Sequence, residues 1–261
     1  MKILRRIAIS FTLYSRIPMP RFEWKEDDMA TSLDFFPLVG AVIGAVICGL
    51  NIGPLSEVIS PYVRALLSVL VPILITGGFH LDGFMDTSDA LNSYGEPEKK
   101  LEILKDPHIG AFAVISLVKL ILIALASAAF ILSGDSLSGE TVITCALVFT
   151  VSRCISGLTS LYFKKAKKSG MLSKEAGDRK KSSVALLALQ LVISAAAMLV
   201  LDPLTALPAL AFFAGYTLYY RRKTKKEFGG VTGDTAGMYV SVSETGAVVC
   251  IAIVLLILRL L

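Results

Sequence analysis

Long apolar runs separated by short polar segments are the feature that most restricts the fold of this sequence. They lie at about residues 35–56, 62–80, 109–132, 141–163, 184–201, 204–220 and 240–261. Runs of about 17–24 residues suit a hydrocarbon core of roughly 30 Å. Only 18% of the residues are charged, against about 25% in soluble domains. We therefore predict an all-α, polytopic helical membrane bundle of about six to seven transmembrane helices, forming one integral membrane domain over residues 1–261.

The segment before the first run is basic as well as apolar. Residues 3–17 include Arg5, Arg6 and Arg16, and Pro18 follows them. Charges at these positions disfavour a membrane span, so we predict an amphipathic helix at the membrane interface that the proline ends. No small-residue cleavage site follows, and we do not expect a removable signal peptide.

Basic residues indicate on which side of the membrane the loops lie. They cluster at 164–168 and 221–226, at the two ends of a predicted helical hairpin, so both clusters lie on one side. The positive-inside rule makes that side cytoplasmic. Counting back through the spans places residues 82–108 on the same side. These loops account for the net charge of +5, which therefore does not indicate nucleic-acid binding.

A stretch rich in aspartate follows the second run directly. Asp82, Asp86 and Asp89 lie four and three positions apart. On a helix they fall within roughly 60° of one another, and like charges at this spacing repel. A hard divalent cation such as Mg²⁺ offsets the repulsion and also binds substrate phosphates. A solvated acidic helix start is the alternative interpretation.

Further polar residues occur on the same predicted side. Lys105 suits a phosphate, and Asp106 suits a metal ion or the cap of a helix starting near Pro107. His108 suits a ligand or an acid–base group. Arg153 lies inside the fourth run, where an arginine is costly and needs an anionic partner, either a carboxylate or a substrate phosphate.

A glycine-rich stretch precedes the last run. Gly229, Gly230 and Gly233 would let backbone N–H groups approach an anion, and Asp234 offers another metal ligand. A flexible connector is the alternative. With the aspartates and basic residues, this stretch favours metal-assisted chemistry on a diphosphate. Zinc is not expected, because the chain has only two His, and its four scattered Cys are interpreted as buried apolar residues.

Residues 77–91, 104–112 and 229–234 resemble the cobalamin synthase family, the adenosylcobinamide-GDP ribazoletransferases. Residues 11–18 and 36–40 are also similar to that family, so the resemblance extends over nearly the whole chain. It implies a Mg²⁺-dependent enzyme of the bacterial cytoplasmic membrane with its active site on the cytoplasmic face. Such an enzyme transfers the adenosylcobinamide phosphate of adenosylcobinamide-GDP to α-ribazole or α-ribazole 5′-phosphate. GMP is released, and adenosylcobalamin or its 5′-phosphate is formed.

This resemblance, with the reasoning above, defines the expected site. The expected metal ligands and catalytic residues are Asp82, Asp86, Asp89 and Asp234, with Asp89 or Asp234 as the general base. The expected substrate-binding residues are His80, Lys105, Asp106, His108, Arg153, Gly229, Gly230 and Gly233. The lipid bilayer is an expected partner, and homo-oligomers or complexes with other enzymes of cobalamin synthesis are further partners that the resemblance leaves open.

Two other functions also remain open. Asp82-Gly-x-x-Asp86 is similar to the signature of the CDP-alcohol phosphotransferases, which act on lipids. The chain departs from that signature with Phe79 where an Asp would stand and with Met85-Asp86 in place of Ala-Arg. A membrane transporter would also place carboxylates and an arginine along its path, but with polar groups on both sides of the bilayer midplane.

Overall fold

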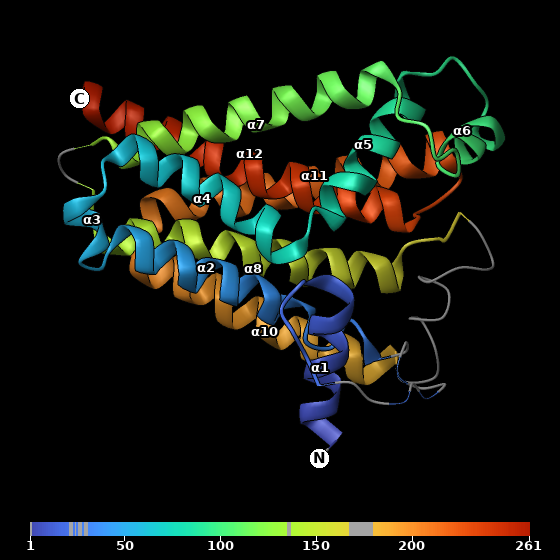
Figure 1. Ribbon diagram of the computed structural model, residues 1–261, viewed down its shortest axis with the longest axis horizontal. Coiled ribbons are helices and arrows are strands. Elements are labelled where there is room, and N and C mark those ends of the chain that lie inside the picture. The colour runs from blue at the N-terminus through green and yellow to red at the C-terminus, as the bar shows by residue number, and fades with distance from the viewer. Residues whose placement is uncertain are drawn as a thin grey trace.

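The computed structural model of the protein consists almost wholly of helices (Figure 1). It describes residues 2–20, 23, 25, 28, 31–134, 137–166 and 180–261, so most of the basic loop after 164 lies outside the described residues. The helices are α1 (Lys2–Tyr14), α2 (Phe36–Asn51), α3 (Leu55–Val58), α4 (Pro61–Thr76), α5 (Phe79–Asn92), α6 (Pro97–Ile103), α7 (Ala111–Leu132), α8 (Gly139–Tyr162), α10 (Lys180–Leu201), α11 (Pro203–Phe228) and α12 (Gly233–Leu260). The long helices lie side by side, which confirms the predicted fold class (Figure 1).

Four of these helices, α7, α8, α10 and α12, are long and apolar enough to cross a membrane. The pair α4 and α5 is a fifth candidate, with a bend of 93° between its two helices. The predicted number of spans is therefore higher than the four or five that the described residues supply. α2 and α4 have 16 residues each, or about 24 Å of helix, which is shorter than a typical hydrocarbon core.

The predicted amphipathic N-terminal helix is present as α1. It ends at Tyr14, before Pro18, and packs against α2. Its arginines are held by acidic residues of the following segment, since Arg5 pairs with Asp28 and Arg6 pairs with Asp34. Its location at a membrane interface stays a prediction.

Small residues allow α2 to pack closely on α8. A Cβ atom at Gly40 would lie 2.3 Å from the carbonyl oxygen of Phe149, and one at Gly44 would lie 2.7 Å from that of Ala146. No side chain fits at such distances, so the backbones touch directly. The GxxxG pattern of the first apolar run therefore marks a close helix contact.

Two glycines form the bend between α4 and α5. Gly77 and Gly78 have φ angles of +67° and +81°, in the left-handed region that is costly for residues with a Cβ atom. α5 then packs across α12 and α7. The aspartates of α5 are therefore carried by a helix that lies outside the four spans and is steeply inclined to them (Figure 1).

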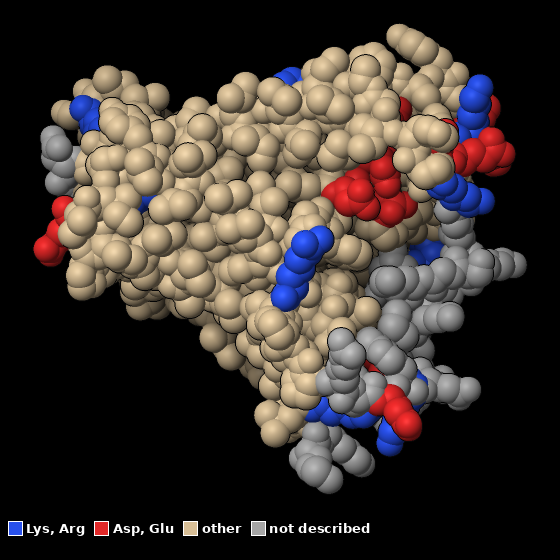
Figure 2. Space-filling model, in the orientation of Figure 1, with Lys and Arg blue, Asp and Glu red and all other residues tan. Residues whose placement is uncertain are grey.

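Charged side chains gather mainly at the ends of the molecule, and a broad surface without them lies between (Figure 2). The end that carries α5 and α6 shows acidic and basic groups together (Figure 2). This distribution suits a protein whose middle faces lipid. The four cysteines are free thiols, as expected. Cys154 is buried, whereas Cys48, Cys145 and Cys250 are only partly buried, so the prediction that all four are buried is wrong for these three.

Candidate active site

Two glycines bring α5 and α12 into direct backbone contact. A Cβ atom at Gly83 would lie 2.8 Å from the carbonyl oxygen of Asp234 and 2.9 Å from its Cα atom. A Cβ atom at Gly237 would lie 2.9 Å from the carbonyl oxygen of His80. Ser241 strengthens the crossing, because its hydroxyl donates to the same His80 carbonyl over 3.2 Å. The crossing fixes the helix of Asp82 beside the start of α12.

The first turn of α12 positions Asp234. The helix begins at Gly233, a few residues before the apolar run that starts at about residue 240, because Thr232 and Thr235 form a capping box. The Thr235 N–H donates to the Thr232 hydroxyl, and the Thr232 N–H donates to the Thr235 hydroxyl. Asp234 thus lies at a helix N-terminus, where the helix dipole stabilises a negative charge.

The carboxylates of both helices form one electrostatic cluster. Asp82 is exposed, whereas Asp86 and Asp89 are half-buried on the same helix. Partial burial raises the pKa of the Asp86 carboxyl to about 6, and repulsion from Asp82, Asp234 and Asp89 contributes to the rise. The four carboxylates therefore lie in one region, and the repulsion among them favours binding of a cation. Their role as metal ligands stays a prediction.

The residues present fit a hard divalent ion. Their ligand atoms are carboxylate oxygens, which Mg²⁺ prefers. Within the part of the chain that the structure describes, no three acidic, His or Cys side chains converge closely enough to hold one ion by themselves. Mg²⁺ usually binds through only one or two carboxylates, with water and substrate phosphates completing its shell. The site thus suits an ion that arrives with a phosphorylated substrate.

Asp89 has a structural task that the sequence did not reveal. Its carboxylate accepts hydrogen bonds from the backbone N–H groups of Gly110 and Ala113, at 2.7 and 2.8 Å. It therefore caps α7 from a different helix. The prediction that Asp106 caps this helix is wrong, because α7 begins only at Ala111 and Asp89 supplies the cap. With both oxygens engaged, Asp89 is less suited than its neighbours to bind a metal ion.

The segment between α6 and α7 is exposed and carries three expected site residues. Lys105, Asp106 and His108 all face solvent. The Asp106 carboxylate lies 2.6 Å from Nδ1 of His108 and accepts the His108 backbone N–H over 3.0 Å. These hydrogen bonds lower the pKa of the Asp106 carboxyl. The cap formed by Asp89 ties the end of this segment to the aspartate helix.

The glycines before α12 connect it to α11. Gly229 ends α11 with a φ of +72°, and its N–H donates to Thr224. The N–H of Gly230 also donates to Thr224, at 3.2 Å, and that of Val231 donates to Lys164 at 2.8 Å. These N–H groups are therefore engaged within the chain and are not free to donate to a phosphate, so a substrate-binding role for Gly229 and Gly230 stays a prediction. Gly233, the first residue of α12, stays a candidate.

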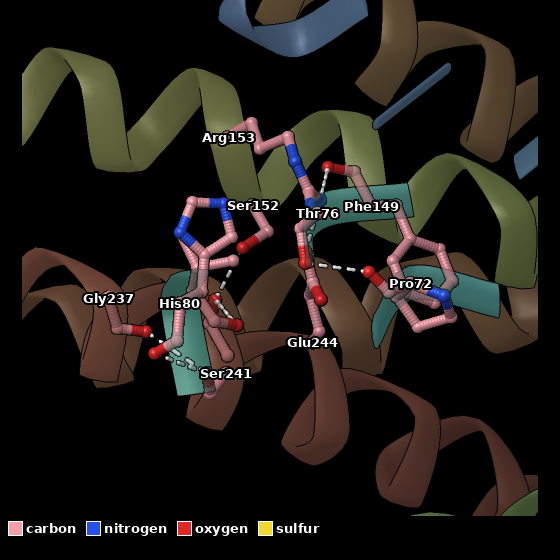
Figure 3. A network of polar contacts seen from close by, with 11 residues as sticks. Pro72, Thr76, His80, Phe149, Ser152, Arg153, Gly237, Ser241 and Glu244 are labelled. Atoms are coloured by element: carbon pink, nitrogen blue, oxygen red, sulfur yellow. Dashed lines mark hydrogen bonds and ion pairs between the residues drawn. The ribbon is translucent and has the colours of Figure 1, made fainter. Parts of the chain in front are cut away.

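Arg153 has a carboxylate as its anionic partner, which is one of the two partners that the sequence predicted, the other being a substrate phosphate. Its guanidinium pairs with Glu244 of α12 and donates to the Phe149 carbonyl at 2.9 Å (Figure 3). The arginine is fully buried, so the pair holds α8 against α12 inside the bundle. His80 is also buried near this pair (Figure 3). Neither residue belongs to the exposed acidic cluster, and the sequence spacing alone did not single out Glu244 as the partner.

The fold and site define a helical membrane protein with a carboxylate cluster at one end of its spans. The chain belongs to the cobalamin-5-phosphate synthase family, whose model matches residues 6–252. Its relatives include an adenosylcobinamide-GDP ribazoletransferase of Lachnoclostridium phytofermentans, 38% identical over 246 residues that cover 92% of this chain and 90% of the relative.

Proteins with the same name occur in Clostridium perfringens (strain ATCC 13124) and Desulfitobacterium hafniense. The first is 32% identical, covering 97% of this chain and 100% of the relative. The second is 31% identical, covering 94% and 95%. No solved structure matches this chain.

Proposed function

We propose that this protein is an adenosylcobinamide-GDP ribazoletransferase of the bacterial cytoplasmic membrane. It transfers the adenosylcobinamide phosphate group to α-ribazole or α-ribazole 5′-phosphate and releases GMP. The observation that carries the chemistry is the crossing of α5 and α12, which holds Asp82 and Asp86 beside Asp234. The family membership and the relatives' names support the choice of substrates.

The carboxylates divide the work of the reaction. Asp82 and Asp86 would hold Mg²⁺ against the diphosphate of adenosylcobinamide-GDP. The ion, when bound, supplies positive charge that stabilises the transferred phosphate and the leaving GMP. Asp234 is the proposed base because it lies at the α5–α12 crossing, whereas both carboxylate oxygens of Asp89 accept hydrogen bonds from α7. The Asp234 carboxylate itself accepts a hydrogen bond from the Thr232 hydroxyl at 3.4 Å.

In the proposed transfer, the phosphorus atom that bears the cobinamide passes from an oxygen of GMP to a hydroxyl oxygen of α-ribazole. A ribose hydroxyl of α-ribazole attacks the phosphorus that bears the cobinamide, while its proton passes to Asp234. The bond between this phosphorus and the oxygen of GMP breaks, and GMP leaves with that electron pair. Lys105, exposed in the segment that follows α6, is proposed to offer a charge that offsets the phosphates. Arg153 is not assigned to phosphate, because Glu244 already neutralises it.

The location of the site follows from the basic clusters. α11 ends in Lys225 and Lys226, and α5 and the start of α12 lie at the same end of the molecule (Figure 1). By the positive-inside rule this end faces the cytoplasm, where the nucleotide substrate is available. The protein thus acts as an interfacial enzyme rather than a transporter.

Purified protein in lipid nanodiscs tests the proposal. With adenosylcobinamide-GDP and α-ribazole it should release GMP and form adenosylcobalamin, and chelation of Mg²⁺ should stop both. A parallel reaction offers CDP-diacylglycerol in place of adenosylcobinamide-GDP, which separates this activity from that of a lipid phosphotransferase. Release of CMP, with no GMP from the corrinoid, would refute the proposed substrate.

A further inference from the structure

A half-open cavity of about 140 Å³ lies between the helices of the bundle, and the residue before Asp82 is part of its lining. Its walls come from α2, α4, α7, α8 and α12, with His80 and Leu81 from the first turn of α5. On α8 the lining extends from Val142 to Arg153, which corresponds to about 16 Å of helix. Most of the lining is apolar, and the polar groups include Arg153, Ser241 and Glu244. A long apolar cavity with a few polar groups is typical of a small-molecule site.

We propose that this cavity binds the dimethylbenzimidazole base of α-ribazole, an inference that rests on the proposed function. The corrin ring, the guanosine diphosphate and the base of the two substrates differ sharply in size and charge. The corrin ring is far larger than the cavity, and guanosine diphosphate is too strongly charged for its apolar walls. The base is flat, bicyclic and apolar, with two methyl groups and one free ring nitrogen. It is the substrate part that the cavity suits.

Two buried nitrogen atoms provide a polar match for the base. Within the described residues, neither Nε2 of His80 nor Nε of Arg153 has a hydrogen-bond partner. Both residues line the cavity. A buried polar group without a partner is unfavourable, and the free ring nitrogen of a benzimidazole accepts one hydrogen bond. Both nitrogens are covered by neighbouring atoms, so a base in the cavity would engage one of them after a side-chain rotation, with Nε–H of Arg153 as the donor whose proton is always present.

The cavity also lies at the right place for the reaction. Leu81 lines it, and Asp82 is the next residue of α5. On α12, Ser241 lies seven residues after Asp234, which is about 10 Å along the same helix face. A base held between these helices leaves its ribose at the α5–α12 crossing. The attacking hydroxyl thus lies close to the carboxylates.

Two substitutions that fill the cavity test the inference. Ala124 and Ala128 line it from α7, whereas Ala126 of the same helix is exposed and lies outside the lining. In Ala124→Phe and Ala128→Phe, the KM for α-ribazole should rise at least about ten-fold, since the base loses its apolar contacts. The KM for adenosylcobinamide-GDP should change less than about two-fold. Ala126→Phe is the matched control and should leave both constants unchanged.

Equilibrium dialysis of free 5,6-dimethylbenzimidazole gives a readout that does not depend on turnover. Protein nanodiscs should bind it above empty discs of the same lipid, and about ten-fold more tightly than benzimidazole, because two methyl groups are buried. Both cavity-filling variants should lose this binding. If both variants turned over at the wild-type rate with an unchanged KM for α-ribazole, the inference about the cavity would be overturned, while the proposed function would stand. Absence of GMP release by the wild type would instead refute the proposed function.

Discussion

Replacement of Gly83 by alanine tests the crossing that positions the carboxylates. The added Cβ atom would lie 2.8 Å from the Asp234 carbonyl oxygen, whereas ordinary contact begins at 3.4 Å, so the helices must separate by at least about 0.6 Å. Overpacking of this kind costs about 1–3 kcal/mol, and the better helix propensity of alanine returns about 1 kcal/mol. The expected loss of stability is therefore about 0–2 kcal/mol, and the protein should still fold.

Although the free energy of unfolding should change little, kcat should fall strongly. A misplacement of about 1 Å can cost about 100-fold in rate, so a shift of this size should reduce kcat about ten-fold or more. GMP release by Gly83→Ala in nanodiscs, measured with thermal unfolding of the same sample, gives both quantities. Gly215→Ala is the matched control, because a Cβ atom there meets nothing within 4 Å. A Gly83→Ala protein with wild-type kcat would show that the crossing does not set the catalytic geometry.

Three further predictions concern the surroundings of the site. Asp89→Ala removes the cap of α7, so amide exchange in the first turn of that helix should become faster, with a loss of about 1–2 kcal/mol. Arg153→Met and Glu244→Leu each leave a buried charge unpaired and should destabilise the protein by about 3–5 kcal/mol, whereas the double variant should recover most of that in denaturant unfolding. The hydrogen bond from Lys100 lowers the pKa of Glu227. The stability that this bond contributes to the folded protein is therefore complete above the ordinary glutamate pKa of about 4.3, and it is lost as pH falls through the lower pKa of the folded state. Amide exchange of α6, corrected for intrinsic rates, should therefore rise below about pH 4, and Glu227→Gln should remove this dependence.

The sequence was sufficient for the fold class and for the aspartate helix. Hydropathy predicted an all-helical membrane protein, and the spacing of Asp82 and Asp86 placed both on one helix, as the structure shows. It overestimated the number of spans, because an apolar run does not reveal where a helix ends. Gly77 and Gly78 end α4 after 16 residues and redirect the chain, and their φ angles depend on that bend rather than on hydropathy.

The roles of several polar residues depended on contacts between distant segments. Asp89 caps a helix that begins more than twenty residues later, and Glu244 pairs with an arginine 91 residues before it. Neither relationship has a local spacing signal. Gly229 and Gly230 fit a phosphate loop by composition, but their N–H groups donate to backbone carbonyl oxygens of α11. The sequence could therefore single out polar residues and glycines as candidates, but it could not identify which group each of them contacts.

The central claim is that the carboxylates at the α5–α12 crossing carry out the transfer. GMP release from adenosylcobinamide-GDP and α-ribazole, measured over a Mg²⁺ titration, tests it most directly. Asp82→Asn and Asp234→Asn should each lose at least about 100-fold in kcat while remaining inserted and folded. Glu57→Gln, an exposed carboxylate on α3 at the other end of the molecule, should match the wild type. Full activity in both aspartate variants would contradict the account.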